Sequence, residues 1–307
     1  MKILVTGGAG FIGSHLVDAF IAQGHDVVVV DNLVSGQMKN LNPKAKFYLM
    51  DIRAQEIAKV FELEKFDAIC HHAAQMDVRK SVADPQFDAD VNVIGSLNLL
   101  QNCVRHGVKK VLFASTGGAI YGEQDVFPAD ETHPTRPLSP YGITKFTMEK
   151  YLFFYAAQYG LKYTILRYAN VYGPRQSPHG EAGVVAIFTS RLLAGQQPTI
   201  NGDGKQTRDY TFVGDVAKAN VLALDYPKND VFNVGTGVET DVNTLFGHLN
   251  AATGNRAQEQ HGPGMPGEQM RSVISYAKIE RVLGWRPQVA LKEGLEQTVA
   301  FFKAQQK

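Results

Sequence analysis

The chain has 307 residues, 44% of them apolar, and a formal net charge of +1 at pH 7. This length and apolar content predict one large domain, or two closely packed ones, with a substantial core. Lys and Arg are spread along the chain and nearly balanced by acids, so we expect neither a nucleic-acid partner nor an anionic membrane partner.

The two cysteines, Cys70 and Cys103, are too few for a metal or disulfide framework. We expect both to be small core residues in a reducing compartment. Glycines interrupt the N-terminal apolar run before it reaches the length of a signal sequence, and no later run is long enough to span a bilayer. These features predict a cytoplasmic protein.

The chain opens with an apolar strand at Lys2–Thr6, and a glycine-rich turn then leads into an apolar-periodic helix that ends near Gln23. Gly7, Gly10 and Gly13 would let the backbone turn sharply and approach a pyrophosphate, which the N–H groups of the helix N-terminus would bind. The spacing is GxxGxxG, one residue wider than the general dinucleotide fingerprint. This strand, turn and helix predict a dinucleotide site.

A second strand, Val27–Val30, ends in Asp31, at the distance where an acid binds the ribose hydroxyls of the adenosine. A carboxylate there would repel a 2′-phosphate, so we expect NAD rather than NADP as the cofactor. A third strand, at Lys46–Met50, is followed by Asp51, which is either a simple cap or a partner of the adenine amino group.

A fourth strand runs from Phe66 into His71 and His72. Adjacent strand residues point to opposite faces, so these histidines cannot bind one metal ion together, and we expect no metal site. A helix over 85–106 carries Asn92 among apolar neighbours, where a polar side chain usually has a specific partner.

A fifth strand, Lys110–Ser115, leads into Thr116-Gly117-Gly118-Ala119-Ile120-Tyr121-Gly122. Alternation of strands and helices predicts a parallel sheet with helices on both faces. Ligands bind at the carboxyl ends of such strands, so we expect these hydroxyls and glycines at the site.

Tyr141 and Lys145 are spaced to share one face of a helix. A nearby ammonium favours phenolate over phenol, so the pair can provide a base near neutral pH. A spacing of this kind also occurs by chance on surface helices, and the interpretation depends on the nucleotide motifs before it.

Taken in order, the glycine turn, Asp31, Asp51-Ile52, STGGAIYG, SPYGITK and RYANVYGP resemble the extended short-chain dehydrogenase/reductases, and among them the UDP-galactose 4-epimerase-like nucleotide-sugar epimerases. The resemblance runs from Met1 into the C-terminal GWRPQVALKEGLEQT. It implies an α/β fold in which a Rossmann doubly wound parallel sheet binds NAD and a smaller C-terminal mixed α/β domain binds the nucleotide sugar. The implied cofactor contacts, besides the glycines and the Tyr141-Lys145 pair, are Phe11, Ile12, Asp31, Asn32, Asp51, Ile52, Ala73 and Asn92.

The second half of the chain fits this division into domains. We expect residues 1–170 to form the NAD-binding domain, with 213–235 returning to it, and residues 171–212 and 236–307 to form the substrate domain. A strand at Tyr163–Tyr168 precedes Asn170, which the resemblance makes a ligand of the substrate diphosphate. Arg208 follows a glycine-rich turn and could bind a phosphate or simply be a solvated arginine, and Arg271 resembles a second phosphate ligand.

The resemblance implies a reaction in which Tyr141 takes a proton from the sugar 4-hydroxyl while hydride passes to the nicotinamide. The 4-keto sugar turns over, and hydride returns to its other face. Thr116, Gly117 and Tyr141 would lie at the sugar, and Lys145 would contact the nicotinamide ribose.

Three residues depart from the family pattern. The usual catalytic serine position is Gly117, so we expect Thr116 to supply the hydroxyl. Met76 stands where a lysine is common near the nicotinamide, and Met265 stands where an arginine often binds the diphosphate. At another position, Ser272 replaces a tyrosine that narrows the sugar pocket, which suggests that UDP-N-acetylhexosamines are accepted as well as UDP-glucose and UDP-galactose.

Alternative functions remain at this stage. Sugar dehydratases and decarboxylases of this family need an acid after the strand-end threonine, and here two glycines follow. A UDP-glucuronate 4-epimerase would need only the same tyrosine, lysine and hydroxyl with a carboxylate pocket. A non-catalytic NAD or nucleotide-sugar-binding protein would typically lose the tyrosine or the lysine, and this chain keeps both.

The helices over 85–106 and 139–159 carry more apolar and aromatic residues than one core-facing stripe needs, among them Tyr151, Phe153, Phe154 and Tyr155. Either both faces pack within the monomer or the helices form a dimer interface, as in relatives. We expect a homodimer.

Overall fold

The computed structural model describes residues 1–178, 183–254, 257–265 and 269–305. In this part of the chain, seven parallel strands form a central sheet with the spatial order β11-β6-β5-β4-β1-β2-β3. The strands are β1 (Lys2–Thr6), β2 (Asp26–Asp31), β3 (Lys46–Leu49), β4 (Ala68–His71), β5 (Lys110–Thr116), β6 (Lys162–Tyr168) and β11 (Asp230–Val234). The order reverses at β1, which is the arrangement of a doubly wound Rossmann sheet and confirms the predicted fold class.

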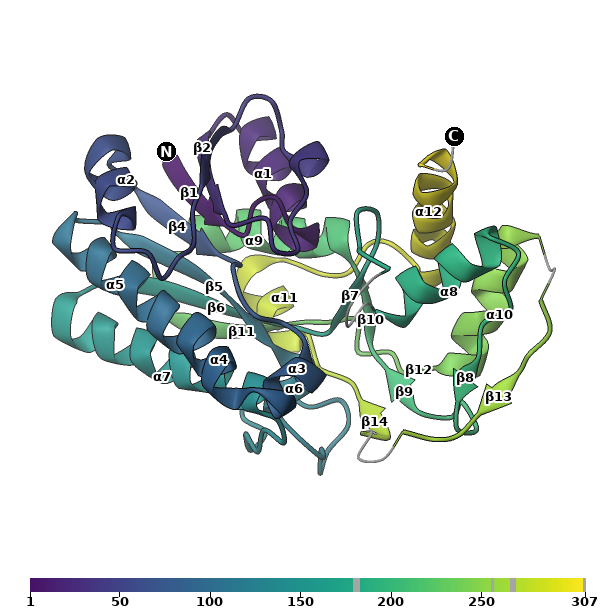
Figure 1. The fold of residues 1–307 in the computed structure, drawn as a ribbon. Helices are drawn as coiled ribbons and strands as arrows, with labels where there is room; N and C mark the ends of the chain where they lie inside the picture. The colour runs from purple at the N-terminus through teal and green to yellow at the C-terminus, as the bar shows by residue number, and fades with distance from the viewer. Residues whose placement is uncertain (179–182, 255–256, 266–268, 306–307) are drawn as a thin grey trace.

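Helices cover both faces of this sheet (Figure 1). One face packs against α1 (Phe11–Ala22), α9 (Val213–Leu224) and α11 (Ala277–Leu283), and the other against α2 (Ile57–Glu64), α5 (Gly95–Arg105) and α7 (Pro140–Tyr159). The strand interiors are apolar and buried on both sides, as a sheet between two helix layers requires. Leu16, Val17 and Phe20 form the buried stripe by which α1 joins the core.

Shorter helices complete the first lobe, and these are η1 (Met38–Asn40), α3 (Val78–Ala83), α4 (Pro85–Ala89), η2 (Asp90–Ile94) and α6 (Gly117–Ile120). The single helix expected over 85–106 is interrupted, because η2 is a π-helical turn between α4 and α5. The hydroxyl of Ser96 donates to the carbonyl oxygen of Asn92 at 2.6 Å within this turn. Such π-helical turns are frequent at functional sites.

The second lobe lies beyond the carboxyl ends of the sheet strands (Figure 1). Its helices are α8 (Val184–Leu193), α10 (Val242–Thr253) and α12 (Leu291–Ala304), which share an apolar core. Its short strands pair as β7 (Asn170–Tyr172) with β10 (Tyr210–Phe212), β8 (Ile200–Asn201) with β13 (His261–Gly262), and β9 (Thr207–Arg208) with both β12 (Thr240–Asp241) and β14 (Arg271–Ser272). Residues 266–268, between β13 and β14, lie outside the described residues.

The path of the chain between the lobes differs in one respect from the sequence-based expectation. Ile279 and Trp285, which sequence patterns place in the substrate domain, are buried in the same core cluster as α1 and α9. The Trp285 indole nitrogen donates to the carbonyl oxygen of Asp215 on α9 at 2.9 Å.

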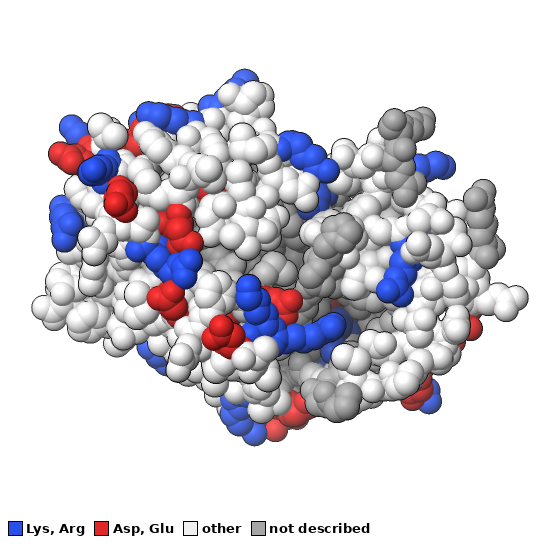
Figure 2. All heavy atoms as spheres, in the orientation of Figure 1, with Lys and Arg blue, Asp and Glu red and all other residues white. Residues whose placement is uncertain are grey.

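Space-filling spheres show that the surface is hollowed between the two lobes (Figure 2).

Candidate active site

The start of α7 fixes the position of Tyr141. Ser139 caps the helix by accepting a hydrogen bond from the Gly142 N–H at 3.1 Å, and Pro140 occupies the first helical position. A Cβ atom at Gly142 would lie 2.7 Å from the Ala119 carbonyl oxygen, so a glycine here lets α7 approach α6 closely. The sequence therefore places Tyr141 beside the segment that follows β5.

Lys145 lies one turn along α7, and its ammonium is buried. The nitrogen donates to the Ala114 carbonyl oxygen at 2.9 Å and lies 5.9 Å from the centroid of the Tyr141 ring. Removal from water lowers the pKa of Lys145 to about 8, a shift that the negative charge of Asp88 opposes. The predicted tyrosine–lysine pair is therefore assembled with an amine whose charge changes near neutral pH.

His71, which ends β4, and His72, which follows it, line the same region. His71 contacts the Thr6 hydroxyl at 2.7 Å and Ser96 at 2.8 Å, whereas His72 contacts the Tyr168 hydroxyl at 2.9 Å. Burial and then the Lys145 charge lower the pKa of both rings, that of His72 to about 3. Both histidines therefore hydrogen-bond to other residues of the protein.

Thr116 ends β5 and precedes the two glycines that open α6. Its hydroxyl makes no capping bond to that helix. A Cβ atom at Gly118 would lie 3.4 Å from the side-chain oxygen of Asn170 and 3.9 Å from the Thr116 hydroxyl, so these two side chains face the same space. The structure thus places Thr116 and Asn170 together.

A side chain at position 117 would collide with a neighbouring residue. A Cβ atom there would lie 2.6 Å from Cδ1 of Ile274, a residue of the second half of the chain. A serine at this position would therefore require Ile274 to move. This contact favours glycine at position 117.

A buried ion pair lies next to the carboxyl end of β5. Arg167 of β6 donates to the two carboxylate oxygens of Glu149 at 3.0 and 2.6 Å, and the Ser115 hydroxyl donates to the same carboxylate at 2.7 Å. Arg167 also donates to the Tyr121 hydroxyl at 2.9 Å. Because every partner is buried, the network fixes the residues on both sides of Thr116.

The glycine-rich turn between β1 and α1 is shaped for a dinucleotide. A Cβ atom at Gly13 would lie 2.1 Å from the Gly7 carbonyl oxygen, and one at Gly7 would lie 2.7 Å from the Ala73 nitrogen. No side chain caps the N-terminus of α1 at Gly10, and its first turn holds no acid. The N–H groups of this turn can therefore bind a pyrophosphate. These residues fit NAD.

Asp31 is buried at the end of β2. Its carboxylate accepts from the N–H of Ala9 at 3.0 Å and from that of Leu33 at 2.8 Å. The acid thus joins the strand end to the glycine-rich turn, next to where a ribose would lie in such a site.

The predicted adenine-side residues form a second cluster. Arg53 binds the Asp51 carboxylate through two nitrogens at 2.9 Å, and Asn32 donates to it at 2.9 Å. These bonds, led by that of Arg53, hold the pKa of Asp51 below its usual range. Arg53 also bridges to Asp90 of η2 at 2.7 Å, a partner that sequence spacing did not suggest.

The remaining predicted cofactor contacts are placed as follows. Phe11 packs edge-on against His15, Ile12 borders the first-lobe core, Ile52 is buried beneath Gly95, and Ala73 donates its N–H to Thr6 at 3.2 Å.

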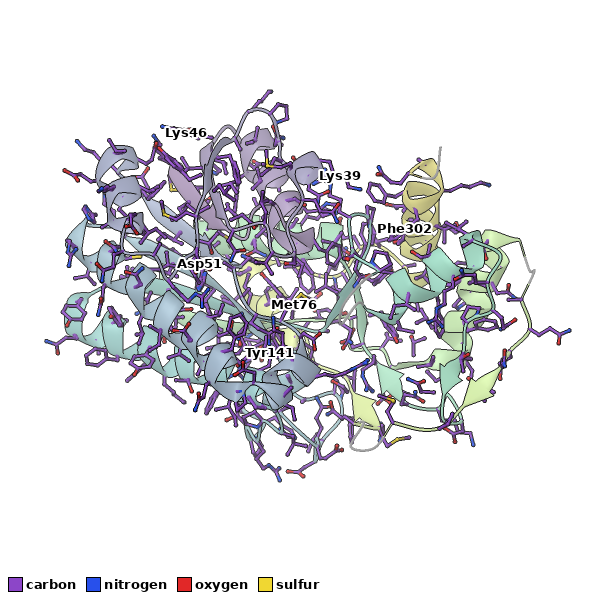
Figure 3. All side chains as sticks on the ribbon, in the orientation of Figure 1. Lys39, Lys46, Asp51, Met76, Tyr141 and Phe302 are labelled. Carbon is purple, nitrogen blue, oxygen red and sulfur yellow. The ribbon has the colours of Figure 1, made fainter. Side chains whose placement is uncertain are left out.

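Asn92 has the specific partner that its apolar surroundings predict. Its amide accepts from the Gln75 N–H at 2.8 Å and donates to the Gln75 carbonyl at 2.9 Å, so it holds the loop after β4. Met76, the residue after Gln75, is exposed and is labelled in the middle part of the molecule in Figure 3. Asn92 therefore fixes the segment that carries Met76.

The two arginines that the sequence predicts as phosphate ligands lie on neighbouring strands but on opposite faces. Arg208 pairs with Ser272 in the β9–β14 ladder, and Arg271 pairs with Thr207. Arg271 and Thr207 both donate to Glu239, Arg271 at 2.6 and 3.0 Å, and Arg271 also lies 3.7 Å over the Phe127 ring. Arg208 instead shares a face with Ser272.

Arg208 is joined to Asn170 through the backbone of Asp209. The Asn170 N–H donates to the Asp209 carbonyl at 2.9 Å, and the Asp209 carboxylate accepts from Thr236 and Gly237. Because Asn170 also borders Thr116, the chain of contacts runs from the predicted proton-transfer residues to Arg208.

Three buried residues that the sequence did not single out shape the site. They are Asp88, which hydrogen-bonds to α7, Ile274, which excludes a side chain at Gly117, and Asp209, which orders the segment beside Asn170. Only Asp88 could have been noticed in the sequence, because it is an acid in a helical segment, as Asn92 is a polar residue among apolar neighbours.

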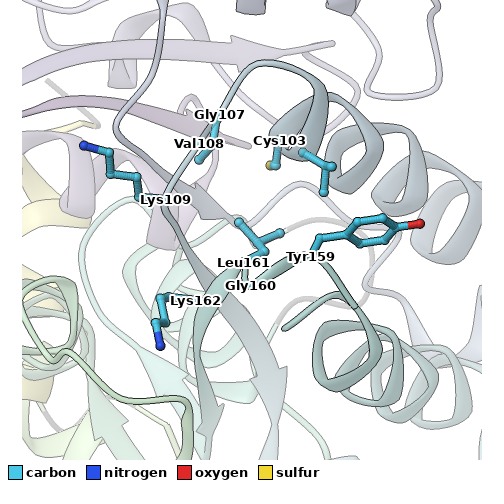
Figure 4. A pocket seen from close by; sticks show the side chains of 9 residues that line it. Cys103, Gly107, Val108, Lys109, Tyr159, Gly160, Leu161 and Lys162 are labelled. Atoms are coloured by element: carbon cyan, nitrogen blue, oxygen red, sulfur yellow. The ribbon is translucent and has the colours of Figure 1, made fainter. Parts of the chain in front are cut away.

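Other features of the described residues add no second site. Within these residues, no His, Cys, Asp and Glu side chains form a group able to hold a metal ion, and no helix is both long and apolar enough to cross a bilayer. A shallow pocket of about 350 Å³ includes Lys109, Tyr159 and Lys162 in its lining (Figure 4). It lies at the amino ends of β5 and β6, away from the catalytic edge.

Known proteins match this chain over nearly its whole length. The model of the NAD dependent epimerase/dehydratase family matches residues 3–235. A UDP-glucose 4-epimerase from Thermotoga maritima, solved with UDP-glucose, is 52% identical with 100% of both chains covered and a TM-score of 0.98. The Thermus thermophilus UDP-glucose 4-epimerase, solved with NAD, is 46% identical over 99% of both chains with a TM-score of 0.94. A UDP-glucose 4-epimerase of Mycolicibacterium smegmatis is 45% identical over 99% of both chains.

Proposed function

Because the chain belongs to the NAD dependent epimerase/dehydratase family, of the extended short-chain dehydrogenase/reductases, we propose that it interconverts the C4 epimers of a UDP-hexose, UDP-galactose and UDP-glucose. The observation that carries the proposal is the buried Lys145 ammonium beside the Tyr141 ring, at the sheet edge where Thr116 ends β5. It is the arrangement that a proton transfer at a sugar hydroxyl needs.

Each of these three residues has a distinct role. Tyr141 accepts the proton of the sugar 4-hydroxyl and later returns it. Lys145 favours the phenolate form of Tyr141 while it is charged. The Thr116 hydroxyl, whose oxygen takes no part in capping α6, hydrogen-bonds the same sugar oxygen.

The cofactor is NAD, held by the glycine-rich turn, the α1 N-terminus, Asp31 at the end of β2 and Asp51 after β3. NAD supplies a temporary acceptor for the C4 hydride. Asn170, Arg208 and Arg271 bind the UDP diphosphate, so that the nucleotide stays fixed while the sugar can turn over. Glu239 must share or release Arg271 for that residue to reach a phosphate.

The sugar pocket also accepts UDP-N-acetylhexosamines. Ser272 supports this extension, because it shares a strand face with Arg208 and its side chain is small. A tyrosine in its place would take the volume that a 2-acetamido group needs.

The test is to incubate the purified protein, with no cofactor added, separately with UDP-galactose, UDP-N-acetylglucosamine and UDP-glucuronate. Chromatography then resolves the C4 epimers. We expect conversion of the first two by the wild type and none by Tyr141→Phe with its NAD still bound. Preferred turnover of UDP-glucuronate would instead indicate a UDP-glucuronate 4-epimerase. No conversion despite bound NAD would favour a binding protein and refute the proposed reaction.

A homodimer and a cytoplasmic location complete the proposal. On the described surface of α5 and α7, the aromatic side chains of Phe153, Phe154 and Tyr159 are about half exposed or more, and Val104 adds to the same face. Burying this face against a second copy would remove it from water. Both cysteines are free and buried, which suits a reducing compartment. Sedimentation at micromolar concentration would test the dimer, and a monomer mass would contradict it.

A further inference from the structure

Asp88 on α4 is a fully buried carboxylate that the reaction described above does not use. Its two oxygens accept three hydrogen bonds from side chains, from Thr144 at 2.8 Å, Gln75 at 2.9 Å and Asn92 at 3.1 Å. All three donors are neutral, so none of them balances the charge that an aspartate carries at neutral pH. A buried charge of this kind needs a compensating one nearby.

The compensating charge lies on α7. Thr144 immediately precedes Lys145, and the Asp88 carboxylate is the acid whose field favours the charged form of that ammonium. The other groups around Lys145 do not play this part. His71 and His72, at the end of β4 and just after it, have pKa values lowered by burial and stay neutral. The β5 contact is a carbonyl oxygen, and Glu149 on α7 is paired with Arg167 of β6.

Asp88 also fixes the loop after β4. Gln75, one of its donors, is held by Asn92 through two backbone bonds and also accepts the Asp77 N–H at 2.7 Å. The exposed Met76 is therefore pinned on both sides, and the same carboxylate joins this loop to the catalytic helix. Figure 3 labels both Met76 and Tyr141 in the middle part of the molecule.

From this geometry we propose that Asp88 is a positioning residue that keeps the Lys145 ammonium charged for proton transfer at Tyr141 and locks the 75–77 loop against α7. The inference rests on the proposed function, because it assigns Tyr141 and Lys145 to proton transfer. An anion beside two ionisable groups raises the pH at which each loses its proton. Asp88 would therefore set the pH range in which the pair works.

The decisive variant is Asp88→Asn, which removes the charge with little change of shape. Ultraviolet absorbance of the NAD-bound protein follows phenolate formation during a pH titration, and subtracting the same titration of Asp88→Asn/Tyr141→Phe isolates Tyr141. We expect the Tyr141 midpoint to fall by about one pH unit relative to the wild type. The pH optimum of kcat should move down with it. A loosened site would instead move the midpoint up, toward about 10.

Asp90→Asn is the matched control, because Asp90 lies two residues along, is exposed and pairs with Arg53. It should leave both the Tyr141 midpoint and the pH optimum where they are in the wild type. An unchanged or raised midpoint in Asp88→Asn would overturn the proposal, as would an equal shift in both variants.

A second pair of variants covers the case in which Asp88→Asn does not fold. Thr144→Val removes the hydroxyl that joins Asp88 to α7, whereas Thr144→Ser keeps it. We expect Thr144→Val to lower kcat by roughly tenfold with KM little changed, and Thr144→Ser to restore it. Equal kcat values in the two variants would refute the proposal.

The absorbance titration needs no turnover, so the two hypotheses can fail separately. A lowered Tyr141 midpoint without conversion of any UDP-sugar would support the role of Asp88 and refute the proposed reaction. Loss of conversion in Tyr141→Phe with no midpoint shift in Asp88→Asn would support the proposed reaction and refute the role of Asp88.

Discussion

The ammonium nitrogen of Lys145 lies 5.9 Å from the centre of the Tyr141 ring and is hydrogen-bonded to the Ala114 carbonyl oxygen of β5. The helix thus presents the phenol while the sheet holds the amine. A charge at this distance in a buried site acts on the phenol strongly, because little water screens it.

The first prediction concerns pH. Burial lowers the pKa of Lys145 to about 8, so the ammonium loses its proton as the pH rises through that value. The neutral amine no longer favours the Tyr141 phenolate, so we expect kcat to decline above about pH 8. Rates at saturating UDP-galactose, measured between about pH 6 and about pH 10, will show this limb.

Lys145→Arg is the control for that assignment. An arginine stays charged over the whole range, so any activity that this variant retains should lack the basic limb. A wild-type profile that stays level to about pH 10 would mean that Lys145 does not set it.

The second prediction separates the hydroxyl of Thr116 from its bulk. Thr116→Ser keeps a hydroxyl at the end of β5 and should keep most of the activity. Thr116→Val keeps the shape but not the hydrogen bond, and we expect kcat to fall by roughly 10²- to 10⁴-fold. Single-turnover measurement of the first proton and hydride step will test this. Comparable rates in the two variants would assign the hydroxyl role elsewhere.

The third prediction concerns the space around Gly117. Gly117→Ser brings a Cβ atom within 2.6 Å of Cδ1 of Ile274 in the present geometry, so we expect it to lower the free energy of unfolding by about 1–3 kcal/mol. Ile274→Val removes the methyl group that clashes. Urea unfolding of both single variants and the double variant measures the coupling.

In the Ile274→Val background, the serine should cost about 1 kcal/mol less than it does alone. Strictly additive effects would show that Ile274 does not restrict position 117, and some other contact would then have to explain the glycine.

The fourth prediction ranks the two arginines that we propose as ligands of the substrate diphosphate. Arg208 shares a strand face with Ser272 and connects to Asn170, whereas Arg271 faces Glu239 on the other side of the ladder. We therefore expect Arg208→Ala to raise KM for UDP-galactose by about 10- to 100-fold and Arg271→Ala by less than about 5-fold. Steady-state kinetics of both variants provide the comparison.

Arg191→Ala, at an exposed position of α8, is a control for general loss of positive charge and should leave KM unchanged. Equal increases for Arg208→Ala and Arg271→Ala would indicate that Arg271 leaves Glu239 when the diphosphate binds.

Local signals in the sequence were sufficient for much of the first lobe. Gly7 and Gly13 are required by contacts within one turn and its neighbouring strand, and the position of Asp31 follows from strand and helix lengths. Ser139, Pro140 and the glycine after Tyr159 mark both ends of α7, so the helix that carries Tyr141 could be predicted closely.

The remaining features depend on residues that are distant in sequence. Ile274 excludes a side chain at Gly117, and the Thr144–Asp88 bond crosses more than fifty positions of the chain. No periodicity encodes such contacts. The opposite orientation of Arg208 and Arg271 depends on the register of two-residue strands, which is too short a pattern to predict from the sequence.

The burial of Trp285 and Ile279 in the first-lobe core has a consequence for how this molecule can be divided. The polypeptide leaves the first lobe after β6, comes back for α9 and β11, and comes back again for α11. Neither lobe is a continuous stretch of the gene. A fragment that ends before residue 276 would expose the core surface that Ile279 and Trp285 cover, so the nucleotide-binding half should neither fold well alone nor be exchanged between proteins by one recombination event.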